Sequence, residues 1–219
     1  MIRSWRAVLI GMLLALGAGT AGAHPHVLIV ASVAPHLDGQ GRIAAFDVIW
    51  AFDPAYSAFT ATDLRSKKGE ARQAALAKLA GEILDNLKEW DYYADLEADG
   101  RRLATGQAVD GAATLDDGTL ELRFRLPLRD PLLLGKGKLA VRFYDPTFYI
   151  AMEMDEAKVF RLTDDMAARC KARVREPALD KGKPLSESFF STEPARPGKD
   201  KRDSIGFSLA MIGELSCNK

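Results

Sequence analysis

The first 23 residues constrain this chain more than any other segment, because they have the pattern of a bacterial secretory signal. Arg3 and Arg6 precede an apolar run from about residue 7 to residue 16, and the segment ends in Ala21-Gly22-Ala23. A signal peptidase recognises this order of a basic start, a short apolar centre and a small-x-small end. The apolar run is too short to span a bilayer as a helix. We therefore expect export to the periplasm, cleavage after Ala23, and a mature chain that does not insert into the membrane.

The charge balance of the mature chain argues against several classes of partner. The whole sequence has 30 Lys and Arg and 30 Asp and Glu. Removing residues 1–23 takes away two arginines and no acid, which leaves 28 basic and 30 acidic residues, a formal charge of −2. Nucleic acids and acidic membrane surfaces attract proteins with a basic excess, so neither is an expected partner.

The two cysteines, Cys170 and Cys217, are expected to form a disulfide. Disulfides form and persist in oxidising compartments such as the periplasm, and a pair in an exported chain is usually bridged. A thiolate metal site is the alternative, but it would need further soft ligands nearby.

Alternating and β-branched runs predict a mostly antiparallel sheet. The runs 27–33 and 43–52 flank the turn sequence Asp38-Gly39-Gln40-Gly41 and predict a hairpin. Asp53-Pro54 then predicts a strand exit or turn. A last strand or short helix is expected in 205–215. Further strand-like runs cover 92–97, 111–115, 120–126, 138–144, 148–154 and 158–162.

One segment predicts a substantial helix. Apolar residues recur every three or four positions between about residues 70 and 90, which places them on one helical stripe that would pack on the sheet. The stripe consists of Leu76, Leu79, Ile83, Leu87 and Trp90. Residues 176–203 contain four prolines and many charges, and predict a long polar loop. Residues 24–219 are therefore expected to form a single α+β domain with one substantial helix packed on a mostly antiparallel sheet, and a sandwich is one arrangement that fits this pattern.

The histidines point to metal chemistry. The chain has three histidines, and two of them, His24 and His26, would lie at the new amino terminus. The amine and imidazole of His24 can chelate one ion, and His26 lies on the same face of an extended chain. Pro25 has no amide hydrogen, which excludes the square-planar copper or nickel clamp that needs a deprotonated second amide. An ordinary solvated terminus is the alternative.

Two carboxylates are candidates to complete such a site. Asp53 and Asp145 each precede a proline at the end of a strand-like run, with aromatic neighbours that could lower the local dielectric. Asp-Pro is also a common turn dipeptide, and for either residue alone the turn role is the more common one. His36, close to the first hairpin turn, is expected at the surface.

Signatures of catalysis are missing from the sequence. It contains no G-x-S-x-G nucleophile motif and no phosphate-binding glycine loop, and three histidines leave little for a Ser-His-Asp triad. A copper oxygenase with a terminal histidine would need a second histidine from a distant segment, and His36 is the only candidate besides His26. We therefore expect a protein that is not an enzyme.

Four pieces of the chain, in order, resemble one bacterial family. They are His24-Pro25-His26-Val27, Trp50-Ala51-Phe52-Asp53 with Ser57, Asn86-Leu87, and Tyr144-Asp145-Pro146-Thr147-Phe148. The family consists of periplasmic proteins of unknown function, often described as periplasmic components of an uncharacterised ABC-type transport system and encoded beside nickel/cobalt-type permeases. The resemblance implies an accessory role in zinc, nickel or cobalt traffic with an inner-membrane permease, and it falls on His24, His26, Asp53 and Asp145.

The chain also departs from that family. Many members have an acidic, glycine-containing run after the second strand that resembles a calcium loop. Here lysine and arginine occupy the ligand places in residues 63–70, so no calcium site is expected. The histidine-rich stretches of some members are missing too, which leaves a single-ion site. A periplasmic copper chaperone with an amino-terminal His ligand and a structural or adaptor protein without metal remain the alternatives.

Overall fold

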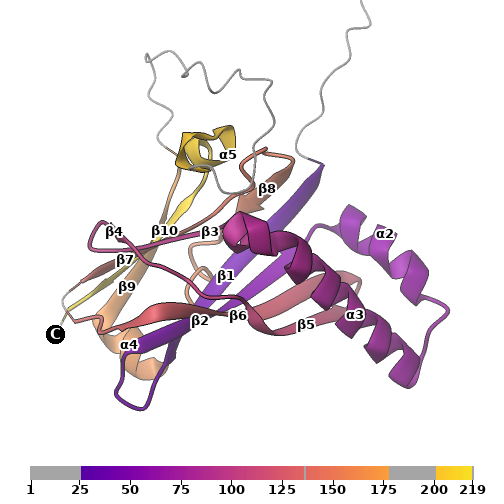
Figure 1. Cartoon of the computed structure of the whole chain (residues 1–219), viewed down its shortest axis with the longest axis horizontal. Helices are drawn as coiled ribbons and strands as arrows, with labels where there is room; N and C mark the ends of the chain where they lie inside the picture. Colours follow the sequence, from indigo (N-terminus) through magenta and orange to yellow (C-terminus); the bar gives the residue numbers. More distant parts are fainter. Residues whose placement is uncertain (1–25, 136, 178–200, 219) are drawn as a thin grey trace, which may run out of the picture.

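Two five-stranded sheets form the body of the molecule (Figure 1). The computed structural model describes residues 26–135, 137–177 and 201–218. The first sheet has the spatial order β5 (Val109–Asp116), β6 (Thr119–Leu132), β2 (Ile43–Phe52), β1 (Val27–Leu37) and β8 (Ile150–Glu153). The second has the order β4 (Arg101–Arg102), β3 (Ala94–Ala98), β7 (Lys138–Phe143), β10 (Ile212–Cys217) and β9 (Cys170–Arg175).

Every strand pair within these sheets is antiparallel except β1 and β8, which run parallel. The predicted hairpin of β1 and β2 is confirmed, with Ala31 opposite Trp50. Its turn is closed by Asp38, whose carboxylate accepts the backbone N–H groups of Gln40 and Arg42. The expectation of an α+β fold dominated by antiparallel sheet is thus confirmed.

The core lies between the sheets. Trp50 of β2 is 1% exposed and makes edge contacts with Phe124 of β6 and Phe143 of β7, at ring-centroid distances of 5.3 and 6.1 Å. Alternate residues of β6 and β7 are buried, as expected for strands with one face in a core. The two sheets therefore share one apolar interior.

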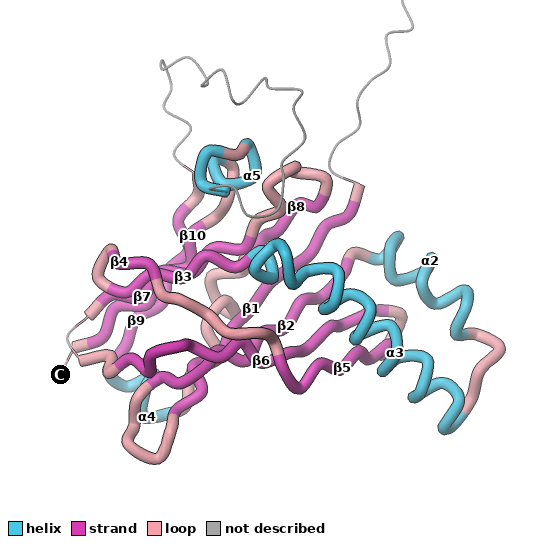
Figure 2. Tube along the Cα trace, in the orientation of Figure 1, coloured by secondary structure: helices cyan, strands magenta, loops and turns pink. Residues whose placement is uncertain are grey.

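The two longest helices of the described residues follow β2 and lie at the same end of the molecule (Figure 2). They are α2 (Pro54–Leu64) and α3 (Gly69–Leu87), and a 3-10 segment, η1 (Lys88–Tyr93), leads into β3. Helix α3 packs on β5. Its buried residues are Leu76, Ala80, Leu84 and Leu87, of which Leu76 and Leu87 belong to the predicted stripe. Leu84 fills the space left by Gly111, because a Cβ at that glycine would lie 2.3 Å from Leu84 Cδ1. Shorter elements are α4 (Asp164–Arg169), η3 (Lys201–Asp203) and α5 (Ile205–Ser208).

Asp53-Pro54 ends a strand, as predicted, and the chain then continues directly into α2, which the sequence did not indicate. One local prediction is wrong. The range 158–162 forms no strand and contributes one isolated bridge, between Phe160 and Val33. The sequence patterns also give no indication of α4 and β9. Of the predicted loop 176–203, residues 178–200 lie outside the described part of the chain, and residues 201–203 form η3.

The predicted disulfide between Cys170 and Cys217 is confirmed. The two residues face each other on the neighbouring strands β9 and β10. The bridge therefore joins the strand that follows α4 to the last strand of the chain.

Candidate functional site

The candidate site is built around the start of β1, where His26 is the first described residue. Its backbone N–H donates to the carbonyl oxygen of Tyr149 at 2.9 Å. Its exposed imidazole stacks on the Tyr149 ring, with centroids 4.6 Å apart and planes 7° from parallel. His24 lies outside the described residues. The fold thus fixes the backbone and the ring of one predicted ligand to the turn before β8.

Asp53 holds the other side of the same segment. Its Oδ2 accepts the N–H of Leu28 at 2.9 Å, and its own N–H donates to the Leu28 carbonyl. Its Oδ1 accepts the N–H groups of Ala55 and Tyr56, which caps α2. Burial alone would raise the pKa of Asp53, but the hydrogen bonds from Leu28, Tyr56 and Ala55 outweigh it and the pKa is lowered. Asp53 is therefore an ionised link between β1, β2 and α2.

Asp145 organises the turn that carries Tyr149. Its side chain is buried and accepts the N–H and hydroxyl of Thr147, at 2.9 and 2.8 Å on Oδ1. Its Oδ2 accepts the N–H groups of Tyr149 and Ile150, both at 3.1 Å. Since the Tyr149 carbonyl in turn accepts the N–H of His26, the Asp145 carboxylate positions the residue to which His26 is bound.

The structure thus brings three of the four predicted site residues to one region, but in different roles. His26 lies between the segments shaped by Asp53 and Asp145, and both carboxylates point at backbone N–H groups. In the part of the chain that the structure describes, no three His, Cys, Asp or Glu side chains gather as a metal-binding group. A ligand role for either aspartate remains a prediction, while the hydrogen bonds show a helix-capping role for Asp53 and a turn role for Asp145.

His36 lies elsewhere on β1, close to the hairpin turn. Its side chain is 41% exposed, and its Nδ1 lies 3.3 Å from Asp47 Oδ2 on β2. The prediction of a surface position is confirmed. His36 therefore gives a natural comparison for His26, since the two histidines lie at opposite ends of β1.

Aromatic residues surround the site, as their neighbourhood in the sequence indicated. Tyr56 stacks on Phe52 with centroids 4.9 Å apart, and Tyr149 is 47% exposed over His26. Tyr93 stacks near Trp50, and both burial and the charge of Asp145 raise its pKa, so its hydroxyl stays protonated. The predicted apolar surroundings are thus present beside both aspartates.

One turn next to the site was not predicted from the sequence. Asp91, Tyr92 and Tyr93 all adopt positive φ, at 48°, 54° and 53°, a costly conformation for residues with side chains. The carbonyl of Tyr93 accepts the N–H of Tyr144, so this turn is tied to the residue before Asp145. Glycine, the usual signal for such a turn, is missing here, and the sequence offers no other sign of it.

Comparisons with known proteins agree with the resemblance at the level of an uncharacterised family. An uncharacterised protein of Haemophilus influenzae is 22% identical over 213 residues, covering 96% of this chain and 98% of the relative. An uncharacterised 15.5 kDa protein from the trpE 3′ region of Spirochaeta aurantia is 34% identical over 73 residues, which are 33% of this chain and 51% of that relative. The model of the family described as "protein of unknown function (DUF1007)" matches residues 9–217, and the chain belongs to that family.

Proposed function

We propose that the mature protein is a periplasmic accessory protein that binds one divalent transition-metal ion, zinc, nickel or cobalt, for an inner-membrane metal permease. The ion would be held by His24, at the amino terminus created by cleavage after Ala23, together with His26. The signal-like residues 1–23 support the export that this proposal requires. Within the described ranges, none of the helices combines the length and apolar character required to cross a bilayer.

The two contacts between His26 and Tyr149 are the observation on which this proposal rests. An exposed histidine next to a chain terminus is usually mobile, yet the Tyr149 carbonyl and ring fix His26 on both its backbone and its imidazole face. A metal ion binds a ring nitrogen in the ring plane, so stacking orients the imidazole without blocking that direction. Such prior orientation of a ligand strengthens metal binding.

Asp53 and Asp145 support the site as positioning residues in this proposal. Their oxygens accept backbone N–H groups that shape the two segments beside His26. Direct ligation would compete with these hydrogen bonds, each of which would leave a backbone donor unsatisfied if broken. Hydrogen-bonded partners behind the ligands commonly affect metal affinity by about 10–100-fold.

Metal affinity should rise with pH, because the α-amine of His24 and the two imidazoles must lose their protons to bind. The same requirement predicts that the uncleaved chain binds more weakly, since it has no free amine at residue 24.

The test is a titration of the processed, untagged protein with zinc, nickel, cobalt and copper. We expect His26→Ala to weaken binding at least as much as the ~10-fold loss typical of a positioning residue, and His36→Ala to leave it unchanged. Equal binding by the His26→Ala variant would contradict the proposal, as would equal binding with residues 1–23 retained. Preference for Cu(II) with nitrogen hyperfine structure would favour the copper chaperone, and no metal uptake would favour the adaptor.

A further inference from the structure

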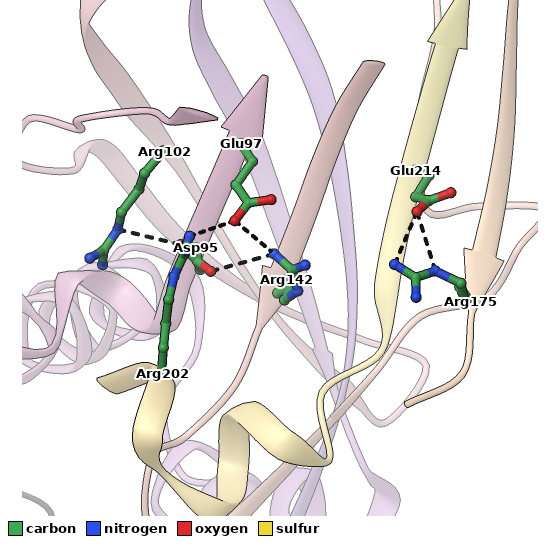
Figure 3. A network of polar contacts seen from close by, with 7 residues as sticks. All are labelled: Asp95, Glu97, Arg102, Arg142, Arg175, Arg202 and Glu214. Carbon is green, nitrogen blue, oxygen red and sulfur yellow. Dashed lines mark hydrogen bonds and ion pairs between the residues drawn. The ribbon is translucent and has the colours of Figure 1, made fainter. Parts of the chain in front are cut away.

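A buried cluster of acids and arginines lies on the outer side of the second sheet, away from the candidate site. Asp95 and Glu97 are two apart on β3 and share the face opposite the core residue Leu96. The Asp95 side chain is fully buried and lies near Arg142 of β7, with Nη1 to Oδ2 at 3.5 Å. Arg102 of β4 lies 3.4 Å from Asp95 (Figure 3). An ionised carboxylate at this depth requires such partners.

The two shortest contacts of the cluster come from Arg202 of η3. One guanidinium nitrogen, Nη2, lies 2.8 Å from Asp95 Oδ1 and 2.7 Å from Glu97 Oε1 (Figure 3). This contact therefore fixes η3, at the start of the described residues 201–218, to β3. Loss of Arg202 would weaken the hold on η3 and α5 but leave Asp95 with two other arginines.

Phe207 of α5 packs into the same region. The guanidinium carbons of Arg142 and Arg202 lie 5.3 and 5.8 Å from its ring centroid, within the range of a cation–π contact. Its ring also meets Tyr144 edge-on at 5.4 Å. The short helix is therefore held between the acid–arginine cluster and the residue that precedes Asp145.

Gly206 brings the backbone of α5 directly onto Asp145. A Cβ built on Gly206 would lie 1.8 Å from the Asp145 carbonyl oxygen and 3.1 Å from Pro146 Cα. Both neighbours are backbone atoms, which cannot rotate away as a flexible side chain would. A residue without a side chain is therefore required where α5 supports the Asp145-Pro146 peptide.

We propose that η3 and α5 position the amino-terminal metal segment, with Arg202 and Gly206 as positioning residues. A continuous series of contacts leads from Arg202 to His26. Arg202 fixes α5, Gly206 lets α5 support Asp145, and the Asp145 carboxylate orients Tyr149. The Tyr149 carbonyl and ring then hold His26. This inference rests on the proposed function for its metal readout, but the position of His26 can be tested without metal.

The experiment compares Gly206→Ala and Arg202→Met with Gly81→Ala and Arg101→Met. A Cβ at Gly81 meets open space, and Arg101 is an exposed arginine on β4, so these are matched controls. The first readout is the imidazole resonance of His26 in the metal-free protein, which the stacked Tyr149 ring displaces upfield. We expect both test variants to lose this displacement and both controls to keep it.

The second readout is metal affinity, where we expect a loss of about 10-fold in the test variants. A folded Gly206→Ala or Arg202→Met protein that keeps the His26 displacement overturns the inference, whatever metal does. If Gly206→Ala does not fold, Arg202→Met decides, because Arg202 is partly exposed and its removal opens no core cavity. A wild-type protein that takes up no metal would contradict the proposed function alone, and the resonance would still test the positioning.

Discussion

The dipeptides Asp53-Pro54 and Asp145-Pro146 have different structural roles although their sequences match. Asp53 is the N-cap of α2, with Pro54 in the first helical position, where the missing N–H of proline costs nothing. Asp145 instead folds its own turn by accepting N–H groups up to five residues along the chain. Both also hold the beginning of β1, directly or through Tyr149. Their carboxylates are thus used in building the site's framework.

Asp53→Ala should lower the free energy of unfolding by about 1–2 kcal/mol at neutral pH, because it removes the cap of α2. It also leaves the Leu28 N–H without its carboxylate acceptor. Urea denaturation gives this value. Asp63→Ala, an exposed aspartate near the other end of the same helix, is the control and should cost nothing.

The cost of Asp53→Ala should also depend on pH. The pKa of Asp53 is lowered from 3.8, so the folded protein binds this proton more weakly than the unfolded chain. The stabilisation is therefore present above that value and is lost as the pH falls through the lower, folded pKa. The difference in the free energy of unfolding between wild type and Asp53→Ala should therefore decrease as the pH is lowered from about 7 to about 2.5. A constant difference would show that the Asp53 charge contributes nothing.

At the scale of elements, the disulfide ties the last strand to the strand after α4. Cys170 and Cys217 are 47 residues apart, and the loop between them includes the part of the chain outside the description. Replacing both with alanine should cost about 4 kcal/mol, because the unfolded chain regains the entropy of that loop. Urea denaturation of the double variant beside the oxidised wild type measures it. A change below about 1 kcal/mol would mean that strain in the folded state offsets the loop term.

A comparison of α3, α2 and β8 shows which sequence patterns are sufficient to predict a helix or a strand pairing. The stripe from Leu76 to Trp90 predicts α3 because it needs only local spacing, although α3 ends at Leu87 and Trp90 lies in η1. Helix α2 was missed because its residues have no such stripe, while the cap and proline that begin it also suit a turn. The parallel pairing of β8 with β1 could not be predicted either, since a short strand does not specify a partner far along the chain.

At the scale of the whole molecule, Trp50 joins the two sheets. It is 1% exposed between β6 and β7, so Trp50→Ala should lower the free energy of unfolding by about 3–5 kcal/mol. Trp50→Phe should cost less, because the structure gives the buried Nε1 no hydrogen-bond partner to lose. Thermal denaturation compares both with Phe59→Ala, whose side chain is 78% exposed. Similar losses for Phe59 and Trp50 would contradict a central role for Trp50.

The candidate site could be predicted in part, because some of its residues have local signals in the sequence. His26, Asp53 and Asp145 were identified from local signals, and the structure gathers them around one strand end. Tyr149, Arg202 and Gly206 could not be found in this way, because their importance arises from contacts between distant segments. The sequence therefore predicted three of the site's residues but not the contacts that orient them.

The pairing of Val27 with Ile150 also sets an order of events during biosynthesis. The hairpin of β1 and β2 can form early, while the partner strand that anchors the segment beside His26 is available only after the chain has been synthesised past residue 150. The start of β1 is thus paired on its second side later than on its first. A nascent chain shorter than that length would present His26 without its contact to Tyr149.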